Sequence, residues 1–293
     1  MARFLLLSDH AASLPLALRL QREGHGVQLY TFDRQAKLVG KGLVSLAPTP
    51  AVSDSSTIVL FDGSGHGAMG RDLRRRKIAV IGGNPLEADL DIQAMKTARI
   101  ATPESHTFRS RPAADAFLAT HHGEWCFTGE DGPYKAKDPK DVARWLGWAA
   151  PSPPFELQRA VRGTAVTVQG WFDGTHWVLP FGGAFADERF LTGDLGPRVG
   201  CQTYATWAWK DDRPDLIDDT ILEMQKPLRA ARYVGPVALR CIVDGEGEPT
   251  GLGWNPGLGP DATPSWCSLV EGDLGVQLAQ FAHGTLSRFE VRQ

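Results

Sequence analysis

The N-terminal third of the chain alternates between short apolar runs and a segment with helical periodicity, and this alternation limits the folds open to it. Residues 4–7 form an apolar run, strand signals cover 27–32, 57–61 and 77–81, and apolar residues recur at helical spacing from 12 to 23. A strand buried on both faces reads as such a run, and strands separated by helices form parallel sheets. We therefore expect an α/β domain over residues 1–95, with helices on both faces of a parallel sheet.

The rest of the chain predicts antiparallel strands. Residues 172–175 read Phe-Asp-Gly-Thr, which predicts a hairpin turn between strands at 164–171 and 176–179. A second strand pair, 237–243 with 250–254, is separated by a turn rich in Gly and Glu. Helical patterns cover 215–232, bent or ended near Pro227, and 268–283. The order predicts an α/β unit followed by an antiparallel α+β unit.

Charge and cysteine content argue against several classes of protein. The 31 basic and 34 acidic side chains give a net charge of −3, which supports neither a nucleic-acid partner nor a membrane surface. The four cysteines are far apart and form no CxxC pair, so we expect reduced thiols and no zinc site. The apolar runs are too short for a signal peptide or for the ~18 residues that span a bilayer. A cytoplasmic protein is the simplest expectation.

Two longer segments resemble one enzyme family. Residues 193–204 read Gly-Asp-Leu-Gly-Pro-Arg-Val-Gly-Cys-Gln-Thr-Tyr, where the family has G-D-x-G-P-N-T-G-G-M-G-A-Y. Residues 233–259 begin Tyr-Val-Gly-Pro and end Gly-Trp-Asn-Pro-Gly-Leu-Gly, where the family has Y-x-G-x-L and E-F-N-x-R-F-G. The chain thereby resembles glycinamide ribonucleotide synthetase, the phosphoribosylamine–glycine ligase of purine biosynthesis and a member of the ATP-grasp superfamily.

The resemblance implies a division of the chain and a reaction. It implies an N-terminal domain over residues 1–95 and an ATP-grasp module over 96–293, with a small subdomain at about 96–160 and a larger one at about 161–293. The family's C-terminal domain has no counterpart in this sequence. In active members, ATP and Mg²⁺ lie between the two subdomains. Glycine's carboxylate becomes an acyl phosphate, which the amine of phosphoribosylamine attacks.

Most residues that this chemistry needs are replaced. In the E-F-N-x-R-F-G stretch, Asn255 remains as a remnant metal ligand, but Gly253 stands for the glutamate and Gly257 for the arginine. Mg²⁺ prefers carboxylate ligands, and phosphoryl transfer depends on charge stabilisation. Neighbouring residues therefore cannot easily compensate for the loss of both the glutamate and the arginine. The acidic residues nearby that offer replacements are Asp244, Glu246 and Asp261.

The nucleotide contacts are reduced as well. Thr128 replaces the lysine that grips the phosphates, and the glycine loop after it is shortened. Lys96 remains as the best candidate phosphate contact, with Lys135 and Lys137 as alternatives. Gln158 stays where the family approaches the adenine edge, although no acidic group is left for the ribose.

The loops that bind substrate in the family also differ. Asp9 and His10 stand where an N-terminal glycine loop binds a sugar phosphate, and the Asp9 carboxylate would repel that phosphate. The glycine-rich turn 62–67 opens a helix beside this loop. The remaining residues that we expect around the cleft are Gly63, Gly65, Asp194, Gly196 and Arg198.

Three hypotheses remain open. The first is a non-catalytic homologue kept for binding or assembly, with an unknown protein partner or with itself, because turn glycines and core patterns persist while the charged site residues are gone. The alternative is a divergent, active ATP-dependent carboxylate–amine ligase that uses ATP and Mg²⁺. In the third, only the N-terminal cleft binds a small molecule, around Asp9, His10 and the 63–67 turn. The residues Trp125, Trp254 and Trp266 further suggest that side chains plug the former cleft.

Overall fold

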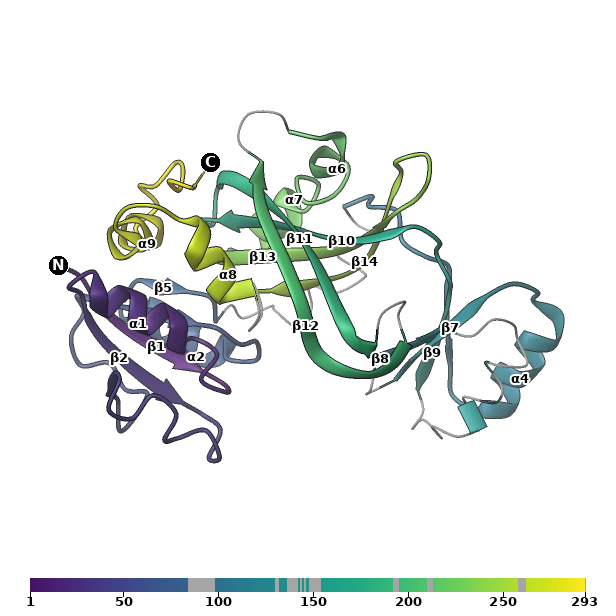
Figure 1. The fold of residues 1–293 in the computed structure, drawn as a ribbon, viewed down its shortest axis with the longest axis horizontal. Helices are drawn as coiled ribbons and strands as arrows, with labels where there is room; N and C mark the ends of the chain where they lie inside the picture. The colour runs from purple at the N-terminus through teal and green to yellow at the C-terminus, as the bar shows by residue number, and fades with distance from the viewer. Residues whose placement is uncertain are drawn as a thin grey trace.

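The chain folds into three sheets with helices between and around them (Figure 1). The computed structural model describes residues 1–83, 98–129, 132–135, 142, 144, 146–147, 154–191, 195–209, 213–257 and 262–292. Figure 1 places the first sheet at one end of the molecule and the third sheet at the other, with the second sheet between them. The expectation of a parallel-sheet unit followed by antiparallel units is confirmed.

The first sheet is parallel and has the strand order β3-β2-β1-β4-β5. Its strands are β1 (Arg3–Ser8), β2 (Gly26–Thr31), β3 (Ser45–Leu46), β4 (Thr57–Phe61) and β5 (Val80–Ile81). The helices α1 (Leu14–Arg22) and α2 (Gly67–Arg75) cover opposite faces, since their buried leucines belong to different cores. The chain adds β2 and β3 on one side of β1 and β4 and β5 on the other. The junction of β1 and β4 is therefore a topological switch point, where open α/β sheets bind their ligands.

The second sheet is antiparallel, with the order β12-β11-β10-β13-β14. Its strands are β10 (Thr164–Phe172), β11 (Trp177–Leu191), β12 (Leu195–Trp209), β13 (Gly235–Val243) and β14 (Pro249–Pro256). Both expected hairpins, β10–β11 and β13–β14, are confirmed. One face of the sheet packs on residues from two short helices, α6 (Asp215–Asp218) and α7 (Gln225–Ala230).

The expectation of one helix over 215–232 is wrong. Six residues in turns separate α6 from α7, and Pro227 lies in the first turn of α7 and does not end a helix. A proline is tolerated there because the N–H groups of the first turn have no partner within the helix.

A long hairpin extends from the second sheet, and the sequence interpretation missed it. β11 and β12 each contain 15 residues. The expected loop at 193–204 is largely strand, because Gly196 and Arg198 both lie in β12. Thr203–Trp209 reads Thr-Tyr-Ala-Thr-Trp-Ala-Trp, which is rich in strand-forming aromatic and β-branched residues. Those residues form the second half of β12, and the strand also includes the earlier residues from Leu195, where the resemblance implied a loop.

The third sheet has the order β6-β9-β7-β8 and its own small core. Its strands are β6 (Ser105–Phe108), β7 (Trp125–Gly129), β8 (Gly132–Lys135) and β9 (Phe155–Arg159), and the helix α4 (Arg111–Thr120) packs on it. Trp125 and Leu157 are fully buried there.

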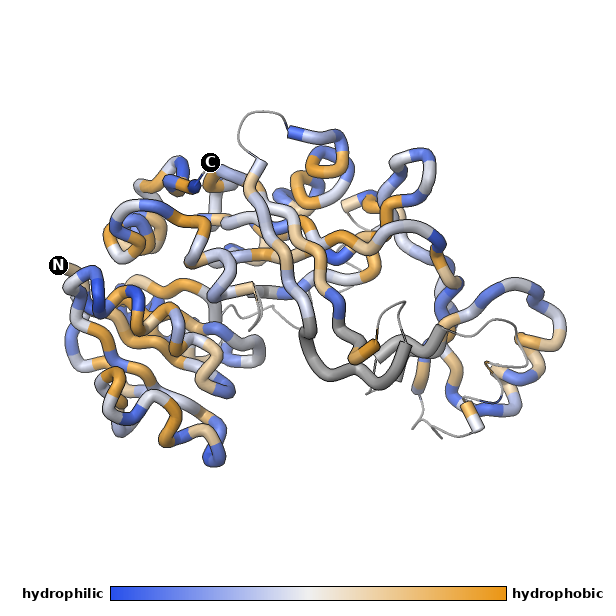
Figure 2. The backbone as a smooth tube through the Cα atoms, viewed as in Figure 1, coloured by the Kyte–Doolittle hydropathy of each residue, from blue (hydrophilic) through white to orange (hydrophobic). Residues whose placement is uncertain are grey.

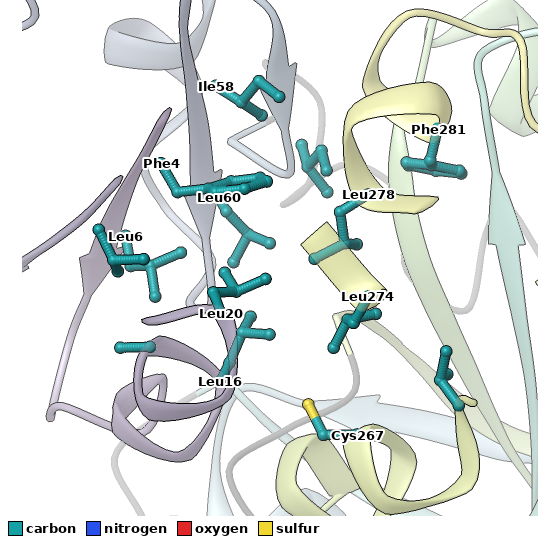
Figure 3. Close-up of a cluster of buried hydrophobic side chains, with 14 of the residues drawn as sticks. Phe4, Leu6, Leu16, Leu20, Ile58, Leu60, Cys267, Leu274, Leu278 and Phe281 are labelled. Carbon is teal, nitrogen blue, oxygen red and sulfur yellow. The ribbon is translucent and has the colours of Figure 1, made fainter. Parts of the chain in front are cut away.

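The C-terminal helices pack against the first sheet. The expected helix at 268–283 starts later than predicted. The helix α8 (Ala262–Leu269) ends near the expected start, and α9 (Leu274–Ala282) begins after Asp273, whose side chain accepts a hydrogen bond from the Val276 N–H at 2.8 Å. Leu274, Leu278 and Phe281 share one buried cluster with Phe4 and Leu6 of β1 and with Leu16 and Leu20 of α1 (Figure 3). In Figure 2 the same strands and helices carry many of the hydrophobic stretches. Within the described residues, the helices are too short or too polar to cross a membrane.

We expect the Leu278→Ala variant to lose about 2–5 kcal/mol of unfolding free energy, because it leaves a cavity where α9 meets the first sheet. Leu278 has an exposed fraction of 0%, whereas Val276 on the same helix is 43% exposed. Urea denaturation of Leu278→Ala and of the control Val276→Ala measures this, and the control should change by less than about 0.5 kcal/mol. Equal losses in the two variants would contradict the shared core.

Candidate functional site

The switch point of the first sheet holds a cluster of hydrogen-bonded polar groups. Asp62 directly follows β4, and its carboxylate accepts hydrogen bonds from the Ser8 hydroxyl, from the Ser13 hydroxyl at 2.5 Å and from the Asp9 N–H at 3.2 Å. Because β1 and β4 are parallel neighbours, their carboxyl ends meet at one edge of the sheet. Asp62 therefore ties the ends of both strands to the start of α1.

His66 is the partner of Asp9 at this edge. The imidazole Nε2 of His66 lies 2.7 Å from Oδ1 of Asp9. The imidazole ring is stacked between Phe32 at 4.3 Å and Phe61 at 5.5 Å, measured between ring centroids. Gly63 makes room for Asp9, since a Cβ atom at Gly63 would lie 1.8 Å from the Asp9 carboxylate. The switch point thus presents an oriented Asp–His pair.

From the sequence we expected Asp9 and His10 to act together in the cleft. In the structure the two side chains have different partners: Asp9 pairs with His66, and His10 lies next to Asp33. His10 lies on the surface with Nδ1 3.3 Å from Oδ2 of Asp33. The hydrogen bond from the Gln35 N–H and the nearby His10 hold the pKa of Asp33 below its usual value. Gly65 has a φ of +87° and open space around its Cα, which is the geometry of a tight turn. His66 could have been predicted as a partner of Asp9. The 62–67 turn follows β4, which is parallel to β1, so this turn and Asp9 lie at the same edge of the sheet.

A small cavity adjoins the switch point. It has a volume of ≈ 30 Å³ and lies between the first sheet, the second sheet and α8; its lining includes Ser13, Asp62, Trp171, Gly257 and Thr263. This volume holds about one water molecule. The indole N–H of Trp171 is buried and has no hydrogen-bond acceptor among the described residues.

Aromatic side chains fill the space beside this cavity. Trp171 of β10 lies 4.6 Å from Trp266 of α8, 5.1 Å from Phe281 and 5.1 Å from Phe289, between ring centroids. The other two tryptophans that suggested a plug lie elsewhere. Trp254 packs with Tyr233 at 5.7 Å on the α6–α7 side of the second sheet, and Trp125 is in the core of the third sheet.

The second sheet has a face opposite its α6–α7 core, which we call the polar face. Along β10, Val166, Val168 and Phe172 point to the α6–α7 core, so Thr167, Gln169 and Trp171 point the other way. Gln169 is buried on this face, where its amide donates to the Tyr204 hydroxyl at 2.5 Å and accepts from Thr206 at 3.5 Å. To this face β13 and β14 contribute Ala238, Arg240, Gly253 and Asn255.

The remnant metal ligand Asn255 is exposed on the polar face, and the described strands on this part of the face carry no carboxylate. Its cross-strand partner is Ala238, and the partner of Gly253 is Arg240. Neither β10, β13 nor β14 contains any Asp or Glu, and Arg240 is the only charged residue in these three strands. These three strands are therefore basic where the resemblance implied acidic metal ligands.

The replacement ligands Asp244 and Glu246 lie at the far end of the same hairpin. Asp244 follows β13, six residues from Ala238, which at the rise of a strand is about 20 Å from Asn255. Its carboxylate accepts hydrogen bonds from the N–H groups of Glu246 and Glu248 at 2.9 Å each, so it shapes the turn. These two acidic residues cannot share a metal ion with Asn255.

Several residues that we expected in the site are not placed at the switch point or on the polar face. Gln158 is half-buried in the third sheet, in register with Ser105 and Cys126. Gly196 and Arg198 lie in the part of β12 near the hairpin tip. The residues Lys96, Asp194, Asp261 and Lys137 lie outside the described part of the chain.

The side chains of Glu23, His25 and Asp273 lie close enough together to suggest a metal ion, but their hydrogen bonds exclude one in this conformation. The Ala2 N–H donates to Nδ1 of His25 at 3.0 Å, so the neutral imidazole carries its proton on Nε2 and donates to Asp273 at 2.8 Å. No lone pair is then left on His25 for a metal. Glu23 accepts from the Gly275 N–H at 3.0 Å. The group joins the first sheet to α9.

Two of the buried cysteines, Cys241 and Cys267, are thiols of low reactivity. Cys126, Cys241 and Cys267 are buried and form no disulfide. Burial raises the pKa of Cys241 and of Cys267 to about 12, which suppresses the thiolate form.

Comparisons with known proteins identify the fold. No protein-family model matches the sequence, and no curated protein matches it. Phosphoribosylamine–glycine ligase from Thermotoga maritima matches the structure with a TM-score of 0.75 and 16% identity, over 99% of this chain and 78% of that chain. N5-carboxyaminoimidazole synthetase from Staphylococcus aureus matches with a TM-score of 0.67 and 10% identity, over 99% and 80%.

A third structure matches over nearly the full length of both chains. D-alanine–D-alanine ligase from Bacillus anthracis, solved in complex with ATP, has a TM-score of 0.57 and 11% identity, over 98% of this chain and 96% of that chain. Identities this low show the fold alone. The chain has the fold of the ATP-grasp ligases.

We expect Gly63→Ala to destabilise the protein by about 1–3 kcal/mol, because the new methyl group displaces the Asp9 carboxylate. In an Asp9→Ala background the same change should cost less, since the obstructing carboxylate is gone. Urea denaturation of the two single variants and the double variant measures the coupling. Gly245→Ala serves as the control, because a Cβ at Gly245 meets no atom within 4 Å. Additive losses would contradict the packing of Asp9 on Gly63.

A pH-dependent contribution is expected from Asp273. Burial raises its pKa, but hydrogen bonds from the Val276 N–H and His25 outweigh burial and hold the pKa below the ordinary 3.8. The ionised form thus stabilises the fold above about pH 4, and this contribution is lost as the pH falls through the lowered pKa. The Tm of the wild type should exceed that of Asp273→Asn at about pH 6, and the difference should shrink below about pH 4. A difference that stays constant with pH would contradict this assignment.

Proposed function

We propose that this chain is a non-catalytic homologue of glycinamide ribonucleotide synthetase, in which the ATP-grasp fold is kept for binding or assembly. The match to the Thermotoga maritima phosphoribosylamine–glycine ligase supports the kinship, together with the two segments at 193–204 and 233–259. The loss of catalysis rests on the charges of the polar face. A fold can persist without its chemistry because function resides in particular side chains.

The observation that carries the proposal is the pairing of Arg240 with Gly253. Mg²⁺ binds hard oxygen ligands, and ATP-dependent ligation needs the ion to neutralise phosphate charge. The strands β10, β13 and β14 supply no carboxylate, and Arg240 lies across from the position where the resemblance calls for a glutamate. A guanidinium there repels a divalent cation.

A second observation concerns the lost arginine. Gly257 has a φ of +123°, a backbone conformation that residues with a side chain rarely adopt. An arginine at this position would strain the end of β14. The local backbone therefore favours glycine at the place where the resemblance implies the arginine that meets the transferring phosphoryl group.

The alternative, a divergent active ATP-dependent carboxylate–amine ligase, requires metal ligands near Asn255. Asp244 and Glu246 lie at the other end of the hairpin and are excluded by distance. Asp261 and Lys96 are the candidates that this alternative still has, and both lie outside the described residues.

We expect purified protein to show no Mg²⁺-dependent increase in Tm with ATP and to form no ADP when ATP, Mg²⁺, glycine and a panel of amines are supplied. Thermal denaturation and mass spectrometry of the products measure these two outcomes. A Tm increase of several degrees that requires Mg²⁺, together with ADP formation, would overturn the proposal and favour the ligase. Asp261→Asn and Lys96→Ala would then identify the groups responsible.

A further inference from the structure

Arg240 is a charged side chain that the fold itself does not use. It is exposed, and it forms no hydrogen bond or ion pair with the described part of the chain. Its position in register with Gly253 leaves space beside it, because a Cβ atom at Gly253 would meet no atom within 4 Å. A cation that stabilises no neighbour and faces open space is available to a ligand.

The groups around Arg240 suit an anion. In the direction of β10 its cross-strand neighbour is Thr167, and Asn255 lies diagonally across β14, about 7–8 Å away between Cα atoms. Both are neutral hydrogen-bonding side chains. Because the three strands hold no carboxylate, nothing in them competes with a ligand for the guanidinium. The guanidinium has five donors arranged as a fork that matches the oxygens of a carboxylate or a phosphate.

We propose that the polar face binds a small anionic ligand, a carboxylate or a phosphate ester, through Arg240 and Asn255 and without a metal ion. This inference rests on the proposed loss of ligase chemistry, because it assigns to an arginine the charge neutralisation that Mg²⁺ provides in a ligase. Arg240 makes the charged contact, and the Asn255 amide donates a second hydrogen bond. Gly253 keeps the space between them open.

The test is isothermal titration calorimetry in EDTA at low ionic strength, with inorganic phosphate, ATP and citrate as separate probes. We expect at least one probe to bind the wild type, and Arg240→Gln to weaken its Kd at least about tenfold. Asn255→Ala should weaken it less. Arg22→Gln is the matched control, because Arg22 is also exposed and has no hydrogen-bond or ion-pair partner in the described part of the chain; its Kd should equal that of the wild type.

The outcomes identify the class of ligand and distinguish the anion site from the proposed loss of catalysis. Binding of phosphate and ATP without citrate would assign the site to phosphate groups, and binding of citrate alone would assign it to carboxylates. If no probe binds in EDTA, or if Arg240→Gln binds as well as the wild type, the anion site is wrong while the loss of catalysis still stands. If ATP binds only when Mg²⁺ is present and ADP forms, both proposals fail together. Thermal denaturation of each variant verifies that it is folded.

Discussion

The first sheet buries one of its faces against helices from the opposite end of the chain, and the second sheet enters the same core. Leu274, Leu278 and Phe281 of α9 enter the same core as Phe4 of β1 and Leu20 of α1. The hydrogen bonds of His25 with Asp273 and with the Ala2 N–H secure the edge of that contact. Trp171 reaches the same core from β10, so the second sheet is fixed as well. The switch point of the first sheet and the polar face of the second therefore meet at a fixed place.

On these two surfaces the charges are the reverse of those that the family resemblance implies. The switch point, where a sugar phosphate would bind, carries the carboxylates of Asp9 and Asp62. The polar face, where acidic ligands would hold Mg²⁺, carries Arg240. A sugar phosphate at the switch point and a metal ion on the polar face would each meet a like charge. The reversal occurs in both sites, which fits a change of ligand better than the decay of one site.

Local sequence patterns predicted the helices and strands well, and they predicted contacts between distant segments poorly. The apolar runs of β1, β2 and β4 and the Asp-Gly turn before β11 are local signals, and all of these elements are present. The Asp9–His66 pair joins residues 57 positions apart, and the sequence showed two polar turns without showing which side chains meet. The break between α8 and α9 had a local signal, because Asp273 stands directly before the apolar Leu274 as an N-cap residue does, but the longer apolar periodicity hid it. Arg240 became meaningful only when the register of β13 and β14 placed it opposite Gly253.

Packing requires one of the glycines in the segment 233–259 that resembles the family. Gly235, in the Tyr233–Gly235 stretch, has a φ of +148°, and a Cβ atom there would lie 3.1 Å from the backbone N of Gly82. The Gly82 N–H donates to the Val234 carbonyl at 2.8 Å, so this stretch joins the end of β5 to the start of β13. Such close backbone approaches select glycine whether or not a nucleotide binds. Gly235 is thus evidence of how the first and second sheets fit together, and the charged residues of the switch point and the polar face carry the evidence about ligands.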